Sequence, residues 1–491
     1  MKIKIYVLTV WVLCLLFACS DFTEIDPKGK NTLSRVEDLN LLLNNEYEVR
    51  LKTLNELIND VYPQTVNIPS LLDESIKTLG GVSLTWDEKT DRAALTNSDN
   101  KYTGLYDIIG KVANPVLLNV DGATGDSRLA AQYKAEALVL RAWCHYLLVN
   151  IYAKAYDPAT AATDPGIVYT RETDDIATPN EKLTVGQVYE SILEDLNAAL
   201  DLNSLPANPN KMRVGLPFAW AAKAKVLMSM RDYEGAFAAA GESLKLKNTI
   251  DDYNQKIELG TFGTQLAPML QIMGITADLR ELVRPYLTCE EELFETPSGF
   301  SLTSFSLEFW QDVEENHLFH SYILTDKKIN ALSPIPIVGN MGEQFSGIDV
   351  SMPLNMNLYY SPIGLTTVDM YLVQAECYIR EGKTDEAMNL LNTIREKRVL
   401  TGTYQPETAS TPEEAFVWLK KISRTENFYT AKTFINLKRW NTEEKYRETL
   451  HKTYRYENQE RSYELRPDSP LWIFPFPQNA TNLNPNLTQN Y

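Results

Sequence analysis

Histidine and cysteine are scarce in this chain, whose 491 residues include four histidines and five cysteines. His317 and His320 stand three positions apart, but no cysteine or carboxylate pattern with metal-ligand spacing accompanies them. Catalytic signatures are missing too: there is no zinc-protease helix motif, serine nucleophile elbow, P-loop or dinucleotide-binding glycine motif. We therefore predict a protein that is not an enzyme, with no catalytic residue, no metal ligand and no cofactor.

Positive charge is also in deficit. The chain has 47 basic and 65 acidic residues, which gives a formal net charge of −18. Such a surface repels phosphate backbones and anionic lipids, so we expect no nucleic-acid partner. Any attachment to a membrane then requires a separate anchor.

One apolar run near the N-terminus supplies a candidate anchor. Residues 5–18 follow two lysines and are too short for a comfortable transmembrane helix. The sequence Leu-Phe-Ala-Cys at positions 16–19 is similar to a bacterial lipobox, so we interpret residues 1–18 as a lipoprotein signal peptide. We expect a lipid on Cys19 that holds the protein to a membrane. A plain secretory signal cut nearby is the alternative.

Three cysteines remain after the signal peptide and the lipid site, namely Cys144, Cys289 and Cys377. An odd number, with two of the three on apolar helical stretches, is not the pattern of a disulfide framework. We predict buried free thiols.

The strongest helical signal spans residues 135–152, which are rich in alanine, leucine, arginine and glutamate. Apolar residues in and before this stretch recur every three or four positions, so they share one face, and we expect a buried scaffold helix. The residues on the shared face are Leu129, Tyr133, Ala137, Leu140, Cys144, Leu147 and Ile151.

Two helical hairpins are predicted further along, at residues 218–244 and 366–400. Both carry small residues where paired helices would cross, as tetratricopeptide repeats do, although generic helix packing has the same requirement. Gly382 lies at the turn of the second hairpin and is expected to adopt the left-handed conformation. Three helix starts are predicted from Ser or Thr followed three residues later by Glu or Gln: Ser34, Thr184 and Thr411.

Residues 251–365 differ in character, because prolines divide them, aromatic residues are frequent and helical periodicity is weak. Residues 63–101 are likewise predicted as loops, and the glutamates at 290–292 as a solvated face. We divide the mature chain into an N-terminal helical region, 19–250, and a C-terminal region, 251–491, which holds the irregular insertion and the second hairpin.

Three short segments carry a family resemblance: residues 135–142, Leu-Lys-Arg-Trp at 437–440, and the asparagine-rich ending at 484–490. With the lipobox and the tether after it, they make the sequence similar to the SusD/RagB family of outer-membrane lipoproteins from Bacteroidetes. The resemblance implies a mainly α-helical fold in which a tetratricopeptide-like scaffold of helical hairpins carries large irregular loop and short-strand insertions. The sequence departs from the family pattern at Thr430, Ala431, Asn436 and Asn490.

The resemblance also implies a location and a task. Family members are lipid-anchored in the outer membrane and face the cell exterior. They bind an oligosaccharide or polysaccharide and deliver it to a partner, a SusC-like TonB-dependent transporter, for nutrient uptake.

Three alternatives stay open. The first is that the chain is a RagB-like uptake lipoprotein, whose ligand is a peptide. A lipid-anchored glycan hydrolase needs only two carboxylates at a set separation, which cannot be recognised among 65 acidic residues. A tetratricopeptide adaptor that binds only protein is the third, although it would not need so long an irregular insertion.

Glycan binding requires aromatic rings that stack on the apolar face of a pyranose and fixed polar partners for its hydroxyl groups. We expect the stacking rings among aromatic residues in irregular, polar surroundings: Trp86, Trp310, Tyr359 and Tyr360. Asp73 and Arg92 are the candidate hydroxyl partners. The competing interpretation for each aromatic residue is simple burial in the core.

Overall fold

The computed structural model describes residues 33–62, 71–72, 77–175, 177–256, 290–296, 303–304, 306–318, 354–355, 361–456 and 459–491. This part of the chain is mainly α-helical, as predicted. The helices are α2 (Val36–Leu43), α3 (Lys52–Leu57), α5 (Leu79–Thr85), α6 (Arg92–Leu95), α7 (Asn100–Ile108), α8 (Asn114–Asn119), α9 (Ser127–Tyr152), α10 (Val185–Asp201), α11 (Leu216–Ser229), α12 (Tyr233–Leu246), α13 (Tyr253–Lys256), α15 (Leu307–Asp312), α19 (Thr367–Arg380), α20 (Thr384–Glu396), α21 (Pro412–Glu426), α22 (Lys432–Trp440) and α23 (Gln478–Thr481).

The described strands form three small antiparallel pairs. The longest pair is a hairpin in which Leu450 lies opposite Leu465. The strands are β1 (Glu292–Phe294) with β4 (Leu365–Thr366), β2 (Thr303–Ser304) with β3 (Leu354–Asn355), and β5 (Leu450–Tyr456) with β6 (Gln459–Leu465).

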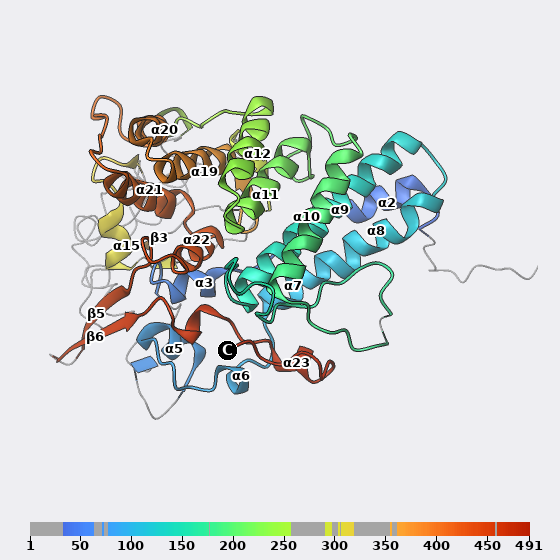
Figure 1. The fold of residues 1–491 in the computed structure, drawn as a ribbon, viewed down its shortest axis with the longest axis horizontal. Coiled ribbons are helices and arrows are strands. Elements are labelled where there is room, and N and C mark those ends of the chain that lie inside the picture. The colour runs from blue at the N-terminus through green and yellow to red at the C-terminus, as the bar shows by residue number, and fades with distance from the viewer. Residues whose placement is uncertain are drawn as a thin grey trace, which may run out of the picture.

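The helices gather in groups (Figure 1). Helices α2, α7, α8, α9 and α10 lie together, α19, α20 and α21 form a second group, and α11 and α12 lie between them. The short helices α5 and α6, the β5–β6 hairpin and α23 lie along the opposite edge, and α3 lies further in, beside α22. No helix among the described residues is long and apolar enough to cross a membrane.

Helix α9 is the centre of the first group. Helices α2, α7, α8, α10 and α11 all contact it, and every residue from 135 to 152 is buried. The prediction of a buried scaffold helix is confirmed for residues 135–152, because neighbours surround the helix on all sides. Leu129, assigned to the shared apolar face, lies on the first turn and is 39% exposed.

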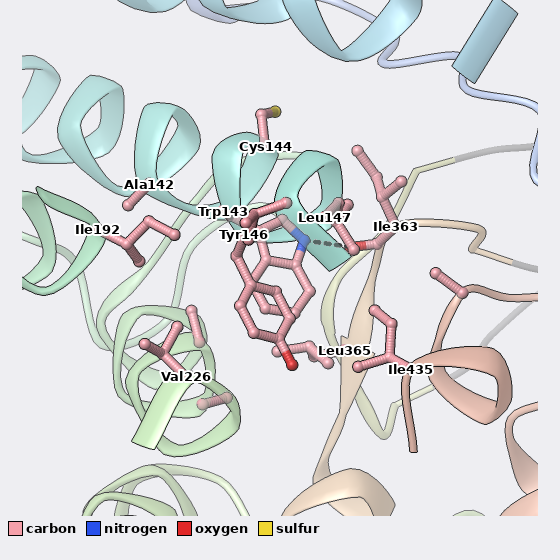
Figure 2. Packing of buried hydrophobic residues seen from close by; sticks show 14 of the residues in the cluster. Ala142, Trp143, Cys144, Tyr146, Leu147, Ile192, Val226, Ile363, Leu365 and Ile435 are labelled. Atoms are coloured by element: carbon pink, nitrogen blue, oxygen red, sulfur yellow. Dashed lines mark hydrogen bonds between the residues drawn. The ribbon is translucent and has the colours of Figure 1, made fainter. Parts of the chain in front are cut away.

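Trp143 of α9 connects the two helical groups (Figure 2). Its indole stacks on Tyr146 with ring centroids 5.0 Å apart, and its Nε1 donates a hydrogen bond of 2.7 Å to the carbonyl oxygen of Ile363. Val226 of α11 and Ile435 of α22 belong to the same buried cluster. The core is therefore continuous from α9 to the C-terminal helices.

Cys144 and Cys377 are buried free thiols, as predicted, and Cys289 lies outside the described residues.

Both predicted helical hairpins are present, as α11 with α12 and α19 with α20. They pack on each other through α12 and α19. Gly382 ends α19 with φ of +75°, the left-handed conformation expected of it.

Two of the three predicted helix starts are confirmed. Thr184 forms a full capping box with Gln187, and the Thr411 side chain accepts from the backbone N–H of Glu414. The third is wrong, because α2 begins after Arg35 and has no side-chain cap. The backbone there pairs with Thr124 instead: the Thr124 N–H donates to Ser34 and its carbonyl accepts from Val36.

The Leu-Lys-Arg-Trp segment at 437–440 lies on α22 and ties that helix to two others. Lys438 donates to the carbonyl oxygens of Asn150 and Ala153, which are left unsatisfied where α9 ends. Arg439 and Trp440 both donate to the buried carboxylate of Glu376 on α19.

The asparagine-rich ending meets the same end of α9. The side-chain amide of Asn490 donates to the carbonyl oxygens of Tyr152 and Gly166. Two of the three segments that carry the family resemblance therefore converge on the C-terminal end of α9, the helix that contains the third.

Two predictions about irregular regions are wrong. Residues 77–101 are not all loop, since they contain α5 and α6. Glu291 is not solvated: it is 5% exposed and ion-paired with Arg398 at 2.9 Å. Burial of Glu291 is possible because the arginine supplies the opposite charge.

Candidate ligand-binding site

A cavity of about 380 Å³ lies among α3, α5, α6, the start of α7 and the C-terminal segment around Phe474. This volume falls within the usual range for small-ligand pockets. The walls come from segments separated by more than 350 positions in the sequence.

One part of the cavity lining is apolar. Leu57 of α3 and Val82 of α5 contribute buried side chains, and Leu471, Phe474 and Pro475 line it from the C-terminal segment. Phe474 is half-buried, so part of its ring is open to solvent. An aromatic ring in such a position can contact the C–H face of a sugar.

The other part of the lining is polar and charged. Lys52 and Glu56 form an ion pair of 3.1 Å on α3, and Lys101 and Asp99 form another of 2.8 Å at the start of α7. Thr96, Ser98 and Asn100 add hydroxyl and amide groups. These groups can donate to and accept from sugar hydroxyls.

The local sequence explains why three short helices surround this cavity. Each begins at a residue whose side-chain oxygen accepts a backbone N–H of the first turn: Thr78 for α5, Asp91 for α6 and Asp99 for α7. Gly81 allows α5 to approach its neighbour closely, because a Cβ there would lie 2.8 Å from the carbonyl oxygen of Leu71.

Trp86 lies behind this cavity rather than in it. It is 5% exposed and ends α5 in the left-handed conformation, with φ of 50°. Its Nε1 donates to the carbonyl oxygen of Leu57 at 2.7 Å, and the Nζ of Lys452 lies 3.6 Å from its ring centroid. This position is that of a packing residue that joins α5 to α3, and it does not support the predicted stacking role.

Lys452 holds the β5–β6 hairpin against α5. It is 2% exposed, and its Nζ donates to the carbonyl oxygen of Ser83 at 2.7 Å. Burial lowers the pKa of Lys452 well below its usual range, and the charge of Glu308 offsets only part of that effect.

Arg92, one of the two predicted hydroxyl partners, lies on the lining of the cavity. Only 6% of it is exposed. Its guanidinium donates to the carbonyl oxygens of Ile473 and Pro470, at 2.8 and 3.0 Å, and lies 4.1 Å from the ring centroid of Tyr491. Arg92 therefore also fixes the C-terminal wall.

Trp310 is half-buried on α15 and is not part of the cavity lining. Helix α15 is nonetheless attached close to α3, because the Ser306 N–H donates to the carbonyl oxygen of Asp60 and Asn59 donates to Glu308. Trp86 and α15 therefore both hydrogen-bond to residues 57–60 at the end of α3. Asp73, Tyr359, Tyr360 and Cys19 lie outside the described residues.

A second hollow, of about 780 Å³, lies on the other side of α5. Thr85, Asp87 and Lys77 line it from the α5 side, and Tyr463 lines it from β6.

Sequence analysis did not predict Tyr463, Phe474 or Lys101 as site residues. No local pattern in the C-terminal segment showed that it lies against residues 92–101.

Within the described ranges, no group of three or more His, Cys, Asp or Glu side chains is arranged to hold a metal ion.

Solved structures with a similar fold cover most of this chain. One is a SusD superfamily protein from Bacteroides thetaiotaomicron, with 16% sequence identity and a TM-score of 0.60 over 93% of this chain and 100% of that one. A putative sugar-binding protein from Bacteroides vulgatus has 16% identity and a TM-score of 0.61 over 94% and 99%. Surface glycan-binding protein A from Bacteroides uniformis has 14% identity and a TM-score of 0.62 over 92% and 99%. By fold, the chain is SusD-like.

Sequence models of the family match both parts of the chain. A SusD-like model described as "starch-binding associating with outer membrane" matches residues 31–227, and the SusD family model matches residues 367–491. No individually curated protein is similar enough to be matched. The chain belongs to the SusD/RagB family, as its sequence predicted.

Proposed function

We propose that this chain is an outer-membrane lipoprotein that binds an oligosaccharide or polysaccharide in the cavity among α3, α5, α6, α7 and the C-terminal segment. It presents the glycan to a SusC-like TonB-dependent transporter for uptake. A lipid on Cys19 anchors it, and the described part of the chain faces the cell exterior.

The observation that carries this proposal is the two-sided lining of the cavity. Apolar side chains, including the half-buried Phe474, lie on one side, and two ion pairs with neighbouring hydroxyl and amide groups lie on the other. A pyranose has the same division between C–H faces and hydroxyl edges. Family membership supports the assignment, and the printed names of two solved relatives refer to sugar or glycan binding.

The lining favours binding over catalysis. Of the two carboxylates in the cavity, Glu56 is held by Lys52 and Asp99 by Lys101. Glycoside hydrolysis needs one carboxyl group that gives a proton to the leaving oxygen and a second that acts as nucleophile or base. Neither ion-paired carboxylate is suited to the proton-donating role.

Affinity electrophoresis of the purified protein against a panel of polysaccharides tests the proposal. We expect slower migration in gels that contain the ligand class, with no release of reducing ends during incubation. Migration unchanged by every glycan, together with binding of peptides, would favour the RagB-like alternative. Product formation from a bound glycan would favour the hydrolase.

A further inference from the structure

The cavity has an excess of positive charge, although the chain as a whole is acidic. Four cationic side chains line it, from Arg50, Lys52, Arg92 and Lys101. Its two carboxylates, Glu56 and Asp99, are already bound by two of those cations. The complete chain, by contrast, carries a formal net charge of −18. Positive charge is therefore concentrated at the one site where we place the ligand.

The remaining two cations differ in their partners. Arg50 lies at the exposed rim and is ion-paired with Glu48 at 3.0 Å. Arg92 is buried, and within the described residues it forms no ion pair with a carboxylate. Glu88, whose charge acts on Arg92 from a greater distance, is itself paired with Arg466 at 3.1 Å. Arg92 is the lining cation whose charge is not locally balanced.

The guanidinium of Arg92 retains donors for a ligand. Arginine has five N–H groups in a planar fork and stays protonated in proteins. Arg92 gives one hydrogen bond each to the carbonyl oxygens of Ile473 and Pro470, which are neutral acceptors. The other N–H groups suit an oxyanion, because a guanidinium matches the geometry of carboxylate and similar groups.

Burial of an unbalanced cation is costly unless an opposite charge compensates it. No described carboxylate does so at Arg92. The Tyr491 ring, whose centroid lies 4.1 Å from the guanidinium, offsets only part of the cost, and an anionic ligand in the cavity is placed to balance the charge. A neutral sugar would satisfy hydrogen bonds but not the charge.

We propose that the glycan taken by this cavity is acidic, and that a carboxylate or sulfate group on it pairs with Arg92. This inference rests on the proposed function, since it names the chemical class of the ligand bound at the same site.

The test compares acidic polysaccharides with their neutral counterparts. Polygalacturonate, alginate, hyaluronan and chondroitin sulfate are placed in affinity gels beside carboxyl-reduced or desulfated forms of each, together with neutral glucans. We expect retardation by at least one acidic polymer and loss of retardation with its neutralised form. Loss on carboxyl reduction identifies a carboxylate, and loss on desulfation identifies a sulfate. Retardation by neutral glycans alone would overturn this inference but leave the proposed function intact, and retardation by neither class would contradict both.

Salt and substitution give two further readouts. Raising the ionic strength from about 0.05 M to about 0.5 M should weaken the acidic interaction of the unmodified protein about tenfold. Arg92→Gln should abolish it, whereas Arg128→Gln, at an exposed ion pair on α9, should not change it. If Arg92→Gln does not fold, Arg92→Lys serves in its place: it keeps the positive charge but lacks the planar fork of donors, and it should weaken binding several-fold. A folded Arg92→Gln protein that binds the acidic polymer like the unmodified protein would overturn the role of Arg92.

Discussion

The ammonium group of Lys452 lies 3.6 Å from the centroid of the Trp86 ring, and that ring donates a hydrogen bond to the carbonyl oxygen of Leu57. These two contacts connect the β5–β6 hairpin, α5 and α3 in one chain of interactions. Helices α3 and α5 are walls of the candidate cavity. Trp86 therefore matters for the shape of the site without touching a ligand in it.

Replacement of Lys452 by methionine changes the pH dependence of stability. Burial lowers the pKa of Lys452 in the folded protein, whereas in the unfolded chain it stays near 10.5. At a pH between these two values the unfolded chain therefore binds more protons than the folded one. The stability of the unmodified protein should therefore rise as the pH rises through the folded-state pKa toward 10.5. Lys452→Met removes this contribution, which is at most about 1.4 kcal/mol per pH unit.

The measurement is the thermal unfolding midpoint of both proteins from neutral to alkaline pH. Lys438, whose pKa is also lowered by burial, is common to both and cancels in the comparison. Parallel pH profiles would contradict the assignment of Lys452 as a buried amine.

The carboxylate of Glu376 should be essential to the C-terminal helices. It is buried, yet the guanidinium groups of Arg439 and Arg380 overcome the effect of burial and lower its pKa well below the usual range. Glu376→Gln leaves those buried cations without their shared partner and should lower the free energy of unfolding by about 3–5 kcal/mol. Chemical denaturation measures this change.

The matched control is Glu413→Gln. Glu413 and Lys445 form an exposed ion pair of 2.8 Å, so its loss should change the free energy of unfolding far less than the loss of the Glu376 carboxylate. Equal effects of the two substitutions would show that the Glu376 network is not a structural centre.

The anchor is tested by Cys19→Ala. Without a thiol at position 19 no acyl chain can be attached there, and the protein should move from the membrane fraction to the soluble fraction. Cys377→Ala, at a buried thiol of α19, should remain membrane-bound. Membrane retention of the Cys19→Ala protein would refute the lipid anchor.

Trp310 stays a candidate stacking residue, although it lies on α15 and outside the cavity lining. If its half-buried ring contacts a bound glycan, Trp310→Ala should weaken binding about threefold to tenfold, since such ring contacts contribute about 0.5–1.5 kcal/mol. Trp220 is a half-buried tryptophan on α11. Helix α11 packs mainly on α12, whereas α15 is hydrogen-bonded to residues 59 and 60 after α3, so Trp220→Ala should leave affinity unchanged. Titration calorimetry separates the two outcomes, and equal affinities of both variants would remove Trp310 from the site.

The scaffold was predictable where its signals are local. Helix α9 shows in the sequence because it is long, and α10 and α21 show because Thr184 and Thr411 cap them with side chains. Helices α5 and α6 were missed because each has fewer than two full turns, too few for hydrophobic periodicity to appear. The burial of Glu291 depends on Arg398, which lies more than a hundred positions away.

The site was predictable only in part, for the same reason. Arg92 was predicted only as a polar side chain able to bind sugar hydroxyls, and the structure places it on the cavity lining. Trp86 was given a stacking role because charged residues flank it in the sequence, yet the fold buries its ring beneath Lys452. Phe474 joins the cavity through long-range packing of the C-terminal segment, which no local pattern reveals.

The most direct test of this account blocks the cavity. Thr53 lies on the exposed side of α3 and lines the cavity, so Thr53→Trp should fill much of it without disturbing the core. Val417→Trp makes a comparable change at a 50% exposed position of α21 that does not line the cavity. Both variants should first be shown to unfold at the same temperature as the unmodified protein. The ligand for calorimetric titration is the glycan that retards the protein in affinity gels. We expect at least a roughly tenfold loss of affinity for Thr53→Trp and no loss for Val417→Trp. Unchanged affinity of the Thr53→Trp protein would contradict the placement of the glycan site in this cavity.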